Sequence, residues 1–252
     1  CNKLRVDIRV LIEQCYYINF EQTSDYMHQM KQCTTMGNYD LLEQLLQKCD
    51  NLPDFQYGVG KQAYTYQQGV VQLKKYKNAA KALEYFNEAL RTFSLMDETG
   101  SERLHIFTIE EIGINTDKAT CLFTLGQRQE AIELLTTSVE SRLANYENVE
   151  TLHILRAYFY LAQFYLQEKN YVKCIEIATK GINLSNCKFV YIYAGDLNAT
   201  KATALHFLGD EEHATFHFRR AYEFYNLLGS SRISTMPVSY THLRAHETLS
   251  DL

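Results

Sequence analysis

The strongest constraint on what this chain can fold into is an eleven-residue pattern that occurs five times. "LGQRQEAIELL" (125–135) is one copy, and the others begin at residues 36, 76, 168 and 208. The residue six places after the first is small in four of the five copies: Leu42, Ala82, Ala131, Cys174 and Ala214. Successive copies lie 40, 49, 43 and 40 residues apart, which is in the range of helical repeats.

Each copy predicts the turn and the second helix of a helix pair. The residue three places beyond the last of the eleven is small in all five copies: Cys49, Ala89, Ser138, Gly181 and Ala221. Between the two small positions, four residues after the first and three before the second, lies the last residue of the eleven, such as Phe86 or Leu135. These spacings place all three positions on one helix face, where small side chains let a neighbouring helix approach closely. Gly37, Gly126 and Gly209 are expected to end a first helix in three copies, since glycine accepts a left-handed conformation. One pair cannot bury its apolar face alone, so the sequence predicts an all-α fold of stacked helix pairs.

This pattern resembles the tetratricopeptide repeat (TPR), whose second helix carries Ala, a bulky residue and Ala at this spacing. The match is strongest over residues 108–226, while Leu42 departs from it and the second copy carries one extra residue before Ala82. The resemblance implies a TPR-like α-solenoid, a right-handed superhelix of antiparallel helix pairs.

Three segments are expected along the chain. Residues 1–25 are predicted to form a connecting helix, and residues 26–230 an array of about five helix pairs. The last segment, 231–252, is expected to be a non-native, poorly ordered tail. Its sequence "MPVSYTHLRAHETLSDL" (236–252) resembles a translated cloning or sequencing adaptor.

Composition narrows the functional classes. A formal net charge of −5 does not favour direct binding of a phosphate backbone, which needs a basic surface. The seven cysteines are odd in number and form no CxxC motif, which indicates reduced thiols in a cytoplasmic protein. No apolar run reaches the length of a membrane span, so no membrane partner is expected.

The sequence indicates neither an enzyme nor a cofactor protein. It contains no Walker loop, GxSxG elbow, HExxH motif or dinucleotide-binding fingerprint. His213 and His217 share a helix face, with His206 on the preceding helix, but no Cys or carboxylate completes a metal site. Cys174 occupies a close-packing position and is expected to be a buried, unreactive thiol.

A stacked array curves, and its first helices line the concave side, so polar residues between their packing positions are groove candidates. Amides, hydroxyls and one Arg suit the backbone of a short peptide or an extended protein segment. A solvated inner surface without a ligand is the alternative for each residue. The candidates are Tyr66, Gln67, Asn115, Thr116, Asp117, Thr120, Arg156, Tyr160, Gln163, Gln167, Asn198, Thr200, Thr203 and His206.

Two longer sequence segments show a second resemblance: "FTIEEIGINTDKATCLFTLGQRQEAIELL" and "GDLNATKATALHFLGDEEHATFHFRRAYEFYNLLG". Together they are similar to the C-terminal region of bacterial helix-turn-helix transcriptional regulators of the peptide-sensing, Rgg/PlcR-like type. The resemblance implies a non-catalytic domain that binds a signalling peptide, forms homodimers, and contacts DNA only through an N-terminal domain absent from this chain. Two alternatives remain open: a general TPR scaffold for protein partners, and a response-regulator phosphatase of the related repeat type.

Overall fold

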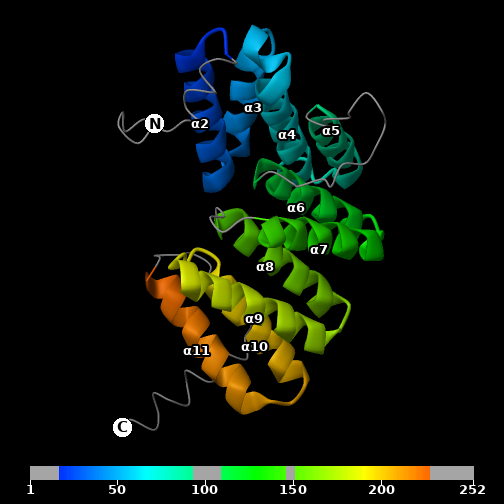
Figure 1. Ribbon diagram of the computed structural model, residues 1–252, viewed down its shortest axis with the longest axis vertical. Helices are drawn as coiled ribbons and strands as arrows, with labels where there is room; N and C mark the ends of the chain where they lie inside the picture. Colours follow the sequence, from blue (N-terminus) through cyan, green and yellow to red (C-terminus); the bar gives the residue numbers. More distant parts are fainter. Residues whose placement is uncertain (1–16, 93–108, 146–150, 228–252) are drawn as a thin grey trace. The chain divides into compact units, whose positions relative to one another are not determined.

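The computed structural model describes residues 17–92, 109–145 and 151–227, and within these ranges it is helical with no strand (Figure 1). Ten α-helices and one short 3-10 helix lie in this part of the chain. They are α2 (Phe20–Met36), α3 (Tyr39–Cys49), η1 (Pro53–Phe55), α4 (Gly58–Lys74), α5 (Ala79–Arg91), α6 (Ile109–Thr124), α7 (Arg128–Asn145), α8 (Thr151–Gln167), α9 (Tyr171–Lys188), α10 (Ala194–Phe207) and α11 (Glu211–Leu227).

The helices form two compact units, which we describe separately. Unit 1 contains α2 to α5 with residues 117–131, and unit 2 contains residues 109–116, residues 132–145 and α8 to α11. In unit 1, α2 packs on α3, α3 on α4 and α4 on α5. In unit 2, α8 packs on α9, α9 on α10 and α10 on α11. Within α2 to α5 and within α8 to α11, each helix therefore packs on the next helix in the sequence, as expected for stacked helix pairs.

The expected segments compare with the helices as follows. The boundary expected after residue 25 falls inside α2, which runs from Phe20 to Met36 without a break. The rest of the expected connecting helix, up to residue 16, and the expected tail at 231–252 lie outside the described residues.

The small residues of the repeat are buried where helices pack against one another. Ala82, Ala131 and Cys174 are completely buried, as are the small residues seven places further on, among them Ala89 and Gly181. Burial raises the pKa of the Cys174 thiol to about 12, so it stays protonated and unreactive near neutral pH. The small side chains thus act as packing contacts, as the sequence pattern predicted.

All five turns between paired helices share one backbone conformation. The second residue of the eleven, which is Gly in three copies, has a positive φ in every copy: Gly37, Lys77, Gly126, Lys169 and Gly209. In four copies the next amide then bonds the carbonyl oxygen five residues back, for example from Asn170 to Tyr165 and from Asp210 to Leu205. In the second copy the corresponding bond, from Asn78 to Gln72, spans six residues, which matches the extra residue in its sequence.

Substitutions at the positive-φ position of the turn should change stability in opposite directions, depending on whether glycine is removed or introduced. Replacing Gly209 (φ 81°) with Ala is expected to lower the free energy of unfolding by about 1 kcal/mol, because a Cβ is strained there. Replacing Lys169 (φ 58°) with Gly is expected to raise it by up to about 1 kcal/mol. Urea denaturation measures both. Two changes of the same sign would contradict a shared turn geometry.

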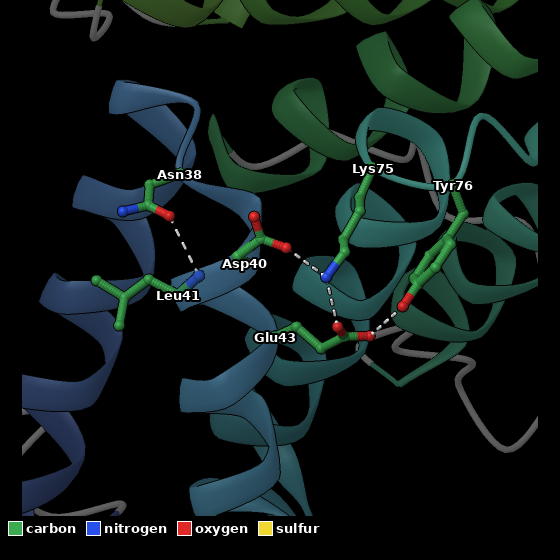
Figure 2. Close-up of polar contacts among 6 residues, drawn as sticks. All are labelled: Asn38, Asp40, Leu41, Glu43, Lys75 and Tyr76. Carbon is green, nitrogen blue, oxygen red and sulfur yellow. Dashed lines mark hydrogen bonds and ion pairs between the residues drawn. The ribbon is translucent and has the colours of Figure 1, made fainter.

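An ion-pair cluster joins the end of α4 to α3 in unit 1 (Figure 2). The Lys75 ammonium lies 2.6 Å from Asp40 Oδ1 and 2.8 Å from Glu43 Oε2. Tyr76 donates a hydrogen bond of 2.9 Å to Glu43 Oε1, and the bonds from Lys75 and Tyr76 lower the pKa of Glu43. Asp40 and Tyr76 are exposed, while Lys75 and Glu43 are half-buried, so solvent weakens the ion pairs and their contribution to stability is small.

None of the helices in the described ranges is long and apolar enough to cross a bilayer.

Candidate functional site

The groove candidates of unit 1 mostly bind one another or other helices. The Tyr66 hydroxyl donates a 2.7 Å hydrogen bond to Asp117 Oδ2, and the Asp117 side chain is buried. Gln67 is also buried, and its Oε1 accepts a 2.8 Å bond from the Thr34 hydroxyl of α2. Tyr66 and Thr120 are half-buried, so they retain some exposed surface.

Two candidates on α6, in unit 2, are packing residues. Asn115 is 1% exposed and donates a 3.2 Å hydrogen bond from Nδ2 to the Ser138 hydroxyl of α7. Thr116 is fully buried, and its hydroxyl donates to the carbonyl oxygen of Ile112, one turn earlier. Both side chains are buried between helices in this conformation, and a role of either in peptide binding stays a prediction.

The candidates on α8 form one stripe, since Arg156, Tyr160, Gln163 and Gln167 follow at intervals of four, three and four. The first three are half-buried and Gln167 is exposed. The Arg156 guanidinium lies 5.7 Å from the centre of the Tyr160 ring, which is a cation–π distance.

A hydrogen bond links this stripe to α10. Gln163 Nε2 donates to Thr200 Oγ1 over 2.7 Å, and the buried Thr200 in turn donates to the carbonyl oxygen of Asp196. Thr203, one turn along α10, is half-buried and donates to the carbonyl oxygen of Ala199. Both threonine hydrogens are used within the helix, so the Thr203 oxygen is an acceptor for any further partner.

Two candidates on α10 point elsewhere. Asn198 is 3% exposed; its Nδ2 donates to the carbonyl oxygen of Ala194, and its Oδ1 lies 2.8 Å from His217 Nδ1 of α11. His206 Nδ1 lies 2.7 Å from Glu211 Oε1 at the start of α11. The buried Asn198 amide is thus engaged by Ala194 within its own helix and by His217 of α11.

We define the α8–α10 face as five accessible candidates on these two helices: Arg156, Tyr160, Gln163, Gln167 and Thr203. His206 is exposed as well but is left out, because it pairs with Glu211. It offers a cation, an aromatic ring and amide and hydroxyl groups along two adjacent helices. The buried candidates Gln67, Asn115, Thr116, Asp117, Asn198 and Thr200 support helix packing instead.

The described residues contain no group of three or more His, Cys, Asp or Glu side chains arranged to hold a metal ion. The three histidines considered in the sequence have separate partners: His213 bonds Asp210, His206 bonds Glu211, and His217 bonds Asn198. The sequence reasoning overlooked Lys201 of α10, which is half-buried one turn after Asn198. Lys201 lies three residues after the candidate Asn198, and this helical spacing is the feature of the sequence that could have indicated it.

No family model and no curated protein matches this chain. Solved structures do. Bacillus thuringiensis PlcR in complex with the peptide PapR7 and DNA is similar with a TM-score of 0.74 and 16% identity, over 90% of this chain and 78% of that one. A Rap protein complexed with Competence and Sporulation Factor gives a TM-score of 0.66 and 12% identity, over 92% and 61% of the two chains. The TPR-like repeats of a kinesin light chain from Podosopora anserina give 0.57 and 13%, over 82% and 96%. These similarities confirm that the fold of this chain is a TPR-like α-solenoid.

Proposed function

We propose that this chain is the non-catalytic, peptide-binding TPR domain of a transcriptional regulator. The observation that carries the proposal is the α8–α10 face, where half-buried polar side chains line two adjacent helices. The structural relatives support it, since one is described with the peptide PapR7 and DNA, and another with Competence and Sporulation Factor.

The chemistry of the face suits an extended peptide rather than a compact small molecule. Gln163 keeps its Oε1 as an acceptor after donating to Thr200, and the Thr203 oxygen also accepts. These groups can bind backbone N–H groups of any sequence, while Arg156 and Tyr160 can select side chains. To act as a switch, the peptide must bind one arrangement of the helix pairs more tightly than another.

The remaining parts of the proposal concern partners and location. We propose that the regulator forms a homodimer and contacts DNA through a domain outside this chain. We also propose that it acts in the cytoplasm, where four buried cysteines, such as Cys121, remain reduced.

A peptide selection tests the function. A displayed library of random linear peptides is selected on the purified chain, and the peptides obtained are titrated by fluorescence anisotropy. Gln163→Ala and Tyr160→Ala are each expected to weaken binding about tenfold, because each removes one hydrogen bond or ring contact.

Glu176→Gln on α9 is the matched control, since Glu176 is exposed and pairs with Lys173 and Lys180 of the same helix. It should leave affinity unchanged. Thermal denaturation establishes that every variant is folded. Peptides that bind all the folded variants equally, or a selection that enriches no peptide, would argue against this face as the binding site.

A further inference from the structure

Helix α10 packs against α11 (Figure 1). A contact between them, from Asn198 Oδ1 to His217 Nδ1, fixes the hydrogen-bonding state of His217. Asn198 Nδ2 donates to the carbonyl oxygen of Ala194, so Asn198 Oδ1 must be the atom that faces the imidazole. An amide oxygen only accepts, and His217 therefore carries a hydrogen on Nδ1. Its Nε2 is left as an acceptor when the ring is neutral and as a donor when the ring is protonated.

Two positively charged side chains lie within one helical turn of the Asn198–His217 contact. Lys201 lies one turn after Asn198 on α10, and Arg220 lies one turn after His217 on α11 with its guanidinium 5.8 Å from the Phe216 ring centre. Burial, and after it the charges of Lys201, Arg220 and His213, together lower the pKa of His217 to about 4. Burial also lowers the pKa of Lys201.

The carboxylates near this cluster are engaged elsewhere. Asp210 bonds His213, Glu211 bonds His206, and the buried Asp196 accepts from the Tyr225 hydroxyl. Glu212 and Glu223 project from α11 about 120–140° away from His217 around the helix. Within the described ranges, Lys201 and Arg220 thus have no carboxylate within ion-pair distance.

The positive charges of Lys201 and Arg220 disfavour each other, and they disfavour protonation of His217, when no anion is present. An oxyanion between them removes that repulsion and accepts hydrogen bonds from each. We propose that Lys201, His217 and Arg220 form a binding site for an oxyanion group, a phosphate or a carboxylate, on the α10–α11 surface. This site is separate from the α8–α10 face, and it does not depend on the peptide-binding proposal.

The test follows the ring of His217 by two-dimensional ¹H–¹⁵N NMR in the full chain between pH 4.5 and 8. Sodium sulfate stands for a phosphate group and sodium trifluoroacetate for a carboxylate, because neither changes its charge in this range. Sodium chloride at the same ionic strength corrects for screening. The bound anion is expected to raise the pKa of His217 by about one to three units, which brings its titration into the observed window.

Lys201→Ala is the variant that separates binding from a general salt effect. Removing a positive charge raises the starting pKa of His217, but the additional increase caused by the anion should become several-fold smaller. Lys180→Ala, which removes an exposed charge of α9, should leave the increase unchanged.

A response to sulfate assigns a phosphate group as the ligand, and a response to trifluoroacetate assigns a carboxylate. The proposal is overturned if neither anion moves the titration of His217 beyond the chloride control. It is also overturned if the increase is the same in Lys201→Ala as in the wild type.

Discussion

Replacing Phe86 with alanine is expected to lower the free energy of unfolding by about 3–5 kcal/mol. Phe86 is fully buried in α5, and its ring lies 5.8 Å from the ring of Tyr66 on α4. The ring also covers Gly69, where an added Cβ would lie 2.4 Å from Phe86 Cε1. Truncation therefore leaves a cavity between α4 and α5, which pack against each other.

The contact with Gly69 makes the effect specific to the pair. Gly69→Ala alone should destabilise by about 1–3 kcal/mol, because the new methyl group overlaps the ring. In a Phe86→Leu background the same change should be much less harmful, which a double-mutant cycle measures by urea denaturation. Glu84→Ala, on the exposed side of α5, is the control and should change stability by less than about 0.5 kcal/mol. Additive effects of the two core substitutions would contradict this packing.

The helix pairs could be predicted because their signal repeats within short stretches of sequence. A small residue such as Ala82 or Ala214 marks the helix–helix contact, and the turn before it follows local backbone rules. The turn signal is wider than glycine alone, since Lys77 and Lys169 hold the same left-handed slot. The Asn or Asp that follows in four copies caps the second helix, for example Asn170 through the amide of Lys173.

The candidate site was less predictable because a first helix of a stacked pair packs on more than one neighbour. Asn115 and Asn198 occupy polar positions that the helical period cannot distinguish from solvated ones. Their partners, Ser138 and His217, lie on other helices, 23 and 19 residues away in the sequence. Only tertiary packing shows that these amides are used internally.

The entry into α2 depends on an even more distant contact, which no pattern in the sequence indicates. The Asp54 carboxylate of η1 accepts from the amides of Ile18 and Asn19 over 2.7 and 2.9 Å, and from the Thr23 hydroxyl over 2.6 Å. Asp54 is 4% exposed, so its removal leaves three donors without their acceptor. Asp54→Ala is expected to lower the free energy of unfolding by about 2–4 kcal/mol at pH 7, measured by urea denaturation.

The same contact predicts a pH dependence. Burial alone would raise the pKa of Asp54, but the hydrogen bonds from Thr23, Asn19 and Ile18 outweigh it, and the pKa is lowered. The stabilisation is therefore complete above the pKa of the unfolded chain, about 3.9, and is lost as pH falls through the lower folded value. The stability difference between wild type and Asp54→Asn should be constant from pH 7 to 5 and should shrink below pH 4. Asp25→Asn, an exposed position of α2, is the control and should show a small difference throughout. A difference for Asp54→Asn that persists unchanged at pH 3 would mean that the ionised carboxylate does not hold residues 18 and 19.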